Sequence, residues 1–216
     1  MAAREPLQWR KLAAEGLDCD YCLLLPRAQA DALFRRLEDE LEYFKGDLTR
    51  IFVYGKWHDI PRQQVSFGDE GLSYKFSGTT VPARPWPPAL LPLRDLVRRV
   101  AGVHFNFVLV NRYRDGRDHI GEHRDDEADL DRGAPIASVS LGQTRTFVLR
   151  HGDARRPGPR RQALPPVKID LEHGSLLMMN YPTNRYWYHS LPPRKSSPGV
   201  RLNLTFRKMA EKSNQK

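Results

Sequence analysis

Short, strand-like segments separated by turns follow one another through the second half of the chain. They cover residues 105–113, 136–141, 146–151, 167–171, 174–179 and 200–208. Two helices are predicted before them, one from Pro26 to Phe44 and a second between the proline-dense stretch 82–92 and Gly102. This order predicts a mainly β fold with flanking helices (α+β), in which the strands form a sandwich or barrel.

The segments before and after the strands fit one integrated domain. We expect a short lead-in (1–20), the helices together with a β-hairpin at 49–59 (21–104), the strand-rich region (105–208) and a C-terminal tail (209–216). Two further strand-like pieces are predicted within 64–80, and a basic loop within 152–166.

Charge and apolar content restrict the class of protein. With 216 residues, 40% of them hydrophobic, the chain can bury a core, and its net charge of +9 favours a polyanionic partner, nucleic acid above all. An acidic membrane surface or a merely well-solvated basic surface would fit that charge as well. No apolar run approaches the ~20 residues that cross a bilayer, and the first residues lack a secretory signal, so we expect a soluble, intracellular protein without membrane association.

Cys19 and Cys22 form a C-x-x-C pair, a spacing that also occurs in zinc and redox sites. No second pair accompanies them, and no helix pattern follows. We therefore expect two reduced thiols.

Two histidines and one aspartate could hold a metal ion. His123 and Asp125 are two residues apart, so on an extended segment both side chains point to the same side, and His189 would come from a distant strand. Two imidazoles and one carboxylate leave coordination positions open, as a non-heme Fe(II) oxygenase requires. The H-x-D pair by itself arises often by chance, and a zinc hydrolase could use the same ligands.

The segment from Arg201 to Arg207 alternates polar and apolar residues, as a half-buried strand does. Its polar face carries Arg201, Asn203, Thr205 and Arg207. Inward-facing guanidinium groups would fit the carboxylates of a dicarboxylate co-substrate, whereas an edge strand would leave the same face solvated. Asn111 and Tyr113 share a face of the strand 105–113 and offer an amide and a phenol as further hydrogen-bond partners.

Taken in order, these motifs resemble the AlkB family of Fe(II)/2-oxoglutarate-dependent nucleic-acid dealkylases, and within it the branch that repairs duplex DNA. The resemblance extends along nearly the whole chain from about Trp9. It is carried by Phe105–Val108 (FNFV), Gly121–Glu127 (GEHRDDE), Ile136–Ser140 (IASVS), Gly174–Asn180 (GSLLMMN) and Trp187–Ser190 (WYHS).

The resemblance implies a double-stranded β-helix (jelly roll) core with an N-terminal nucleotide-recognition lid and hairpin. It makes His123, Asp125 and His189 the ligands of Fe(II). The co-substrates would be O2 and 2-oxoglutarate, the latter held by Arg201 and Arg207 with Asn111, Tyr113 and Asn203.

The same resemblance assigns the contacts to DNA. Val53, Tyr54 and Gly55 would form a hairpin wedge that inserts an aromatic ring into the base stack, with Tyr54 where the relatives carry Phe. Arg62 would steady the opposite strand, and the basic segments 150–161 and 194–195 would contact phosphates. The flipped base would be covered by the lid residues Tyr74, Phe76 and Ser77 and approached by Asp126 and Glu127.

The activity implied is oxidative demethylation of 1-methyladenine and 3-methylcytosine, with etheno adducts as further substrates, in double-stranded DNA. The expected protein is a monomer in the nucleus, and sliding-clamp binding is doubtful because no clamp motif precedes Trp9. Three alternatives stay open: the same chemistry on methylated RNA or a protein side chain, a non-catalytic module that binds damaged DNA, and a metal-dependent hydrolase.

Overall fold

The core of the protein consists of two antiparallel sheets. The computed structural model describes residues 6–53, 55–76, 79–155 and 164–210. In spatial order, the larger sheet contains β1 (Arg10–Ala14), β2 (Leu17–Leu23), β13 (Ser175–Met179), β10 (Ile136–Gly142), β15 (Arg201–Arg207), β8 (Phe107–Tyr113) and β5 (Gln63–Gly68). The smaller sheet contains β12 (Val167–Leu171), β11 (Arg145–His151), β14 (Trp187–Leu191) and β9 (Ile120–His123).

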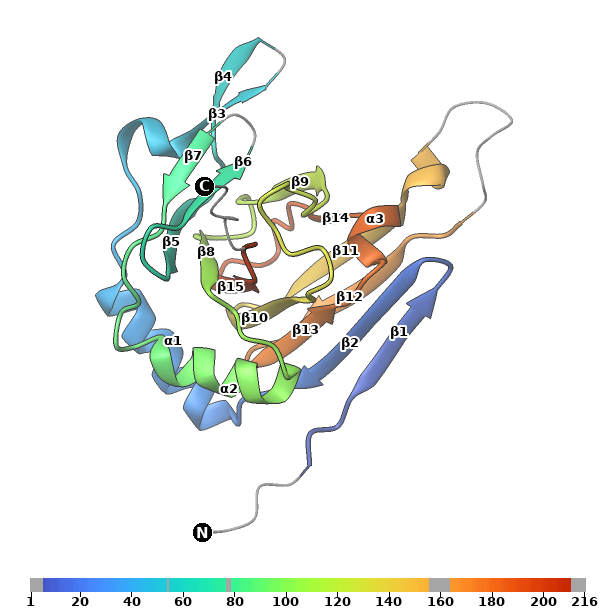
Figure 1. Cartoon of the computed structure of the whole chain (residues 1–216), viewed down its shortest axis with the longest axis horizontal. Helices are drawn as coiled ribbons and strands as arrows, with labels where there is room; N and C mark the ends of the chain where they lie inside the picture. The colour runs from blue at the N-terminus through green and yellow to red at the C-terminus, as the bar shows by residue number, and fades with distance from the viewer. Residues whose placement is uncertain (1–5, 54, 77–78, 156–163, 211–216) are drawn as a thin grey trace, which may run out of the picture.

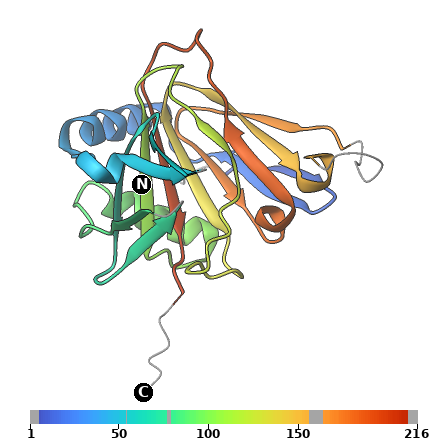
Figure 2. The ribbon, with the colours of Figure 1, turned by 90° about the horizontal axis from the view of Figure 1, so that it is seen from above.

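The two longer helices lie on the side of the larger sheet away from β9 and β14 (Figures 1 and 2). They are α1 (Arg27–Glu40) and α2 (Leu91–Ala101), and a single-turn helix, α3 (Thr183–Tyr186), connects β13 to β14. Gly102 ends α2 in the left-handed region with a φ of 66°, a conformation that glycine adopts without steric cost. The mainly β architecture with flanking helices is therefore confirmed. Among the described residues, no helix has the length and apolarity needed to cross a bilayer.

Strand β15 lies at the centre of the larger sheet, between β10 and β8. Its apolar residues Leu202, Leu204 and Phe206 are fully buried, and its polar residues are buried too, with Arg201 at 1% and Arg207 at 4% exposure. The alternative of a solvated edge strand is thus wrong, because neighbouring strands cover both edges of β15 and both of its faces lie inside the protein.

The N-terminal region differs from the expectation of a lead-in over residues 1–20. Strands β1 and β2 begin at Arg10 and Leu17, and β2 pairs with β13 in the middle of the domain. The sequence of β2 does carry the pattern of a half-buried strand over five residues, because Asp18 and Asp20 alternate with the buried residues Leu17, Cys19 and Tyr21. The first helix is also shorter than predicted, since the backbone becomes extended at Leu41.

The C-x-x-C cysteines lie within β2. Both are buried and neither forms a disulfide, and burial raises the thiol pKa of Cys19 to about 12 and that of Cys22 to about 11. Residues three apart on a strand point to opposite faces, so the two thiols cannot share one metal ion. The expectation of reduced thiols is confirmed.

Two small hairpins stand between α1 and α2 in the sequence. The first, β3 (Arg50–Val53) with β4 (Lys56–Asp59), projects from the body of the protein (Figure 1). Phe52 and Trp57 face each other across it, with ring centroids 5.4 Å apart, and both are about half exposed. The second hairpin consists of β6 (Ser73–Phe76) and β7 (Thr79–Pro82), so the region 64–80 holds three strands with β5 instead of the predicted two.

Short 3-10 helices precede β3, at Gly46–Thr49, and follow β11, at Gly152–Arg155.

Candidate active site

Pairing between two strands of the smaller sheet brings the predicted metal ligands together. His123, the last residue of β9, lies opposite His189 of β14, and their ring centroids are 4.3 Å apart. Asp125 lies just beyond the end of β9, with its Oδ1 atom 3.5 Å from His123 Nε2 and 3.8 Å from His189 Nε2. One ligand atom from each residue lies within 4.8 Å of the others, so the three can bind one metal ion.

Neighbouring groups fix the orientation of the His123 ring and the charge of the His189 ring. His123 Nδ1 is 2.9 Å from the Gly121 carbonyl, which can only accept, so this nitrogen carries the proton and Nε2 presents its lone pair to the site. His189 is buried and stacks on Phe147, with ring centroids 5.2 Å apart. Burial first, and then the neighbouring His123, lower the pKa of His189 to about 3. His189 is therefore suited to be a neutral metal ligand, and His123 directs Nε2 toward the same place.

Asp125 joins the metal site to the predicted 2-oxoglutarate site. Its Oδ2 atom accepts a hydrogen bond of 2.8 Å from Arg207 Nη2, and both side chains are 4% exposed. Burial alone would raise the pKa of Asp125, but the charge of Arg207 is the strongest opposing influence, and the pKa is lowered. The carboxylate therefore stays ionised. Arg207 Nε has no partner among the described residues.

Arg201 is a buried cation without a carboxylate partner among the described residues. Its Nη2 donates to Ser140 Oγ at 3.0 Å, and its guanidinium lies 5.2 Å from the centre of the Tyr113 ring. Its Nε and Nη1 atoms are buried without a partner, and burial lowers its pKa to about 10. An isolated buried charge is costly, so this environment fits a carboxylate of a bound ligand.

The residues predicted to assist these arginines lie beside them in the sheet. Tyr113 pairs with Arg201, and Asn111 with Asn203, across β8 and β15. The Asn203 amide donates to Ser138 Oγ at 2.8 Å and to the Val139 carbonyl at 3.2 Å, contacts that hold β15 against β10. Asn111 has a different environment, because its Oδ1 atom accepts hydrogen bonds from Arg62 and Gln64.

Two of the predicted base-contacting residues, Tyr74 and Glu127, are joined by a hydrogen bond. Tyr74 is buried and its hydroxyl donates to Glu127 Oε1, while Glu127 Oε2 is buried without a partner among the described residues. Burial first, and then the charge of Asp125, raise the pKa of Glu127. Asp126 is more exposed and forms an ion pair of 2.9 Å with Arg124.

The structure does not test every predicted DNA contact. Tyr54 and Ser77 lie outside the described residues, as do the side chains of Val53 and Phe76 and the segment 156–163. Gly55 has a φ of 75° beside the hairpin tip. The wedge and the covering of the base by Phe76 and Ser77 stay predictions.

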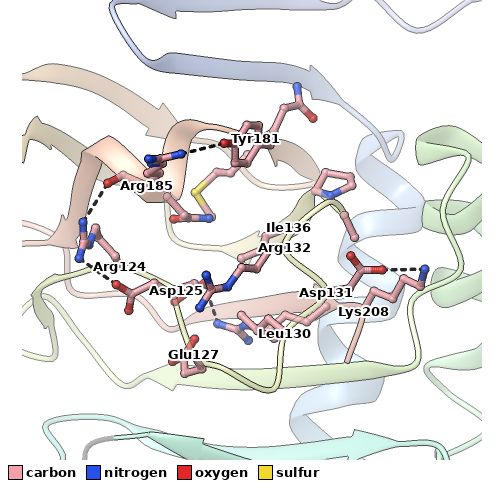
Figure 3. Close-up of a pocket in the computed structure, with 17 residues that line it drawn as sticks. Arg124, Asp125, Glu127, Leu130, Asp131, Arg132, Ile136, Tyr181, Arg185 and Lys208 are labelled. Atoms are coloured by element: carbon pink, nitrogen blue, oxygen red, sulfur yellow. Dashed lines mark hydrogen bonds and ion pairs between the residues drawn. The ribbon is translucent and has the colours of Figure 1, made fainter. Parts of the chain in front are cut away.

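A pocket of about 620 Å³ lies against this site (Figure 3). Asp125, Glu127 and Arg207 line it on one side. Arg124 and Arg185 line a different side of the pocket, where Arg124 Nη1 donates a hydrogen bond of 2.9 Å to the Arg185 carbonyl. The pocket therefore joins the charged groups of the metal site to a rim that carries further cations.

Sequence analysis missed Gln64 and Arg145. Arg145 is 1% exposed, and its guanidinium donates to the carbonyls of Asp118 at 3.0 Å and Pro192 at 2.8 Å. It thus ties the loop before β9 to the end of β14, the two strands that carry the histidines. Its partners are backbone carbonyls, which leave no motif in a sequence.

Comparisons with known proteins agree with this geometry. The model of the "2OG-Fe(II) oxygenase superfamily" matches residues 21–207. The chain is 58% identical over 201 residues to "DNA oxidative demethylase ALKBH2" of Mus musculus, covering 93% of this chain and 84% of the relative. For the Homo sapiens protein of that name, the identity is 57% over 201 residues, covering 93% and 77%.

More distant similarities concern a second relative and a solved structure. "Alpha-ketoglutarate-dependent dioxygenase alkB homolog 3" of Homo sapiens is 38% identical over 152 residues, which are 68% of this chain and 51% of the relative. "The structure of OsALKBH1" superposes with a TM-score of 0.59 at 18% identity and covers 94% of this chain and 100% of the other. This likeness concerns the fold alone, and it confirms the expected oxygenase fold.

Proposed function

Because the chain belongs to the 2OG-Fe(II) oxygenase superfamily, we propose that it is a DNA oxidative demethylase, an Fe(II)- and 2-oxoglutarate-dependent dioxygenase that repairs alkylated bases. The observation that carries the proposal is the pairing of a His–Asp–His set with two buried guanidinium groups that retain unpartnered nitrogens. Such a site needs both a cation between the three ligands and an anion at the arginines, and Fe(II) with 2-oxoglutarate supplies both.

Each side chain has a task in this reaction. Fe(II) held by His123, Asp125 and His189 would supply the oxidation, in which O2 and 2-oxoglutarate yield succinate and CO2 while the N-alkyl group is hydroxylated and leaves as an aldehyde. Arg207 and Arg201 would bind the carboxylates of 2-oxoglutarate. Their burial excludes water and strengthens that charge pairing.

Glu127 supports an alkylated base as the substrate. Methylation at the ring nitrogen makes adenine or cytosine cationic, and Glu127 Oε2 is a buried acceptor without a partner among the described residues. Tyr74 holds the other oxygen of that carboxylate. We propose that Glu127 binds the cationic edge of the flipped base, with Asp126 nearer to solvent.

The test of the function is formaldehyde release from a DNA oligonucleotide with one 1-methyladenine, measured in duplex and in single strand, beside a single-stranded RNA with the same lesion. We expect release that requires both Fe(II) and 2-oxoglutarate, with the duplex favoured. Release from single-stranded RNA alone would transfer the chemistry to another substrate. A protein that binds the lesion without turnover would instead be a damage-binding module.

Preference for duplex DNA rests on Tyr54. Replacing Tyr54 with alanine is expected to lower turnover of duplex substrate about tenfold, because stacking on a base contributes about 1–3 kcal/mol, and to change single-strand turnover little. Trp9→Ala, which removes another exposed aromatic ring, is the matched control. Equal losses on both substrates would contradict the wedge role.

We also propose that the protein acts as a monomer in the nucleus, where duplex DNA is its substrate. The net charge of +9 supports a polyanionic partner. Imaging of a tagged full-length chain tests the location, and light scattering tests the oligomeric state.

A further inference from the structure

Two donors meet at the amide oxygen of Asn111. Arg62 Nε and Gln64 Nε2 each lie 2.8 Å from Asn111 Oδ1. Gln64 is paired with Asn111 in the register of β5 and β8, and Arg62 comes just before β5. Asn111 is 4% exposed, so this arrangement lies inside the protein.

Arg62 determines the orientation of the Asn111 side-chain amide. A guanidinium group only donates hydrogen bonds, so the atom of Asn111 that faces Arg62 must be the oxygen. The Nδ2 donor then points to the other side of the amide. Asn111 shares its face of β8 with Tyr113, whose ring lies against Arg201, so this donor belongs to the region where the ligand carboxylate is expected.

Gln64 cannot set this orientation alone. An amide both donates and accepts, so Gln64 and Asn111 would bond equally well if both amides were rotated by half a turn. Gln64 Oε1 is buried and has no partner among the described residues, so nothing there opposes the rotation. The rotated pair would present the oxygen of Asn111 to the carboxylate, which would replace an attraction with a repulsion.

We propose that Arg62 is a positioning residue of the 2-oxoglutarate site, which acts by fixing the Asn111 amide with its Nδ2 donor toward the carboxylate. The inference rests on the proposed function. It gives Arg62 a role that does not need DNA. The guanidinium has a further contact, from Nη1 to the His119 carbonyl at 3.4 Å, which holds it in place.

The test is the binding of 2-oxoglutarate, without DNA, to the full chain loaded with Mn(II), measured by titration calorimetry. Arg62→Met is expected to weaken binding by about two- to threefold, because the two orientations of the amide pair then become about equally populated and only one of them binds the carboxylate. Arg62→Lys retains a group that only donates and should bind 2-oxoglutarate as tightly as the unchanged protein. Arg36→Met is the matched control, because Arg36 forms an exposed ion pair of 2.7 Å with Glu40 within α1.

A double-mutant comparison separates this role from a general structural one. In an Asn111→Ala background, Arg62→Met should cause no further loss of 2-oxoglutarate affinity, because the amide it orients is gone. Turnover of single-stranded substrate by Arg62→Met should show a raised KM for 2-oxoglutarate, whereas Arg62→Lys should show none.

The outcomes distinguish the inference from the proposed function. If Arg62→Met binds 2-oxoglutarate normally, or loses affinity equally with and without Asn111, the inference is overturned and Arg62 is left with its predicted role on DNA. If the unchanged protein itself binds no 2-oxoglutarate, the proposed function is overturned and the inference with it.

Discussion

Replacing His123 with alanine is expected to lower formaldehyde release by more than roughly 100-fold, beyond the loss typical of a residue that only supports a metal ligand. The reason is the loss of one of three ligand atoms that lie within 4.8 Å of one another. The fold should survive, because the His123 side chain is 34% exposed and its other nitrogen contacts one backbone carbonyl. Activity, bound iron and thermal denaturation measure the three effects.

His119→Ala is the matched control for this variant. His119 has the same local contact, from Nδ1 to the carbonyl two residues earlier at 3.0 Å, but is not one of the grouped ligands. It should keep both iron and activity. If His123→Ala still released formaldehyde in a metal-controlled buffer, the assignment of His123 as a ligand would be wrong.

Replacing Arg207 with methionine is expected to raise the KM for 2-oxoglutarate about 100-fold or more and to destabilise the metal-free protein by about 3–5 kcal/mol. The first effect follows from the loss of a charge-assisted contact to a carboxylate. The second follows because Asp125 is left buried without its 2.8 Å ion-pair partner. Chemical denaturation with a chelator present measures the stability of the metal-free protein.

Metal binding should remove most of that loss of stability. A divalent ion between the three ligands places positive charge beside Asp125 and replaces the charge that Arg207 supplied. The difference in melting temperature between the unchanged protein and Arg207→Met should therefore shrink when Mn(II) is added. A difference that stays constant would show that Arg207 does not stabilise the fold through Asp125.

Arg201→Met provides the contrast on the same strand. Arg201 has no carboxylate partner among the described residues, and its Nε and Nη1 atoms are unpartnered. Its replacement should weaken 2-oxoglutarate binding without destabilising the metal-free protein, because removing an isolated buried charge relieves a cost. Replacing either arginine is thus expected to weaken 2-oxoglutarate binding, but only Arg207→Met is expected to lower the stability of the metal-free protein.

The sequence predicted those parts of the fold that depend on local pattern. The alternation from Arg201 to Arg207 predicted a strand with its polar residues on one face, and the register with β8 and β10 agrees. Gly102 predicted the end of α2. By contrast, β1 and β2 were not predicted, because β1 is short and mostly exposed and β2 alternates over only five residues before the buried Cys22 breaks the period.

The sequence alone determined the chemistry that the site offers, namely two imidazoles, one carboxylate and two guanidinium groups at spacings that resemble a known family. Only the tertiary structure decided that β15 is central, that Arg207 faces Asp125 and that Arg62 faces Asn111. The physical reason is the sequence distance over which each interaction acts. Alternation and turn residues act between neighbours in the chain, whereas Asp125 and Arg207 are 82 residues apart, and only sheet pairing and burial bring them together.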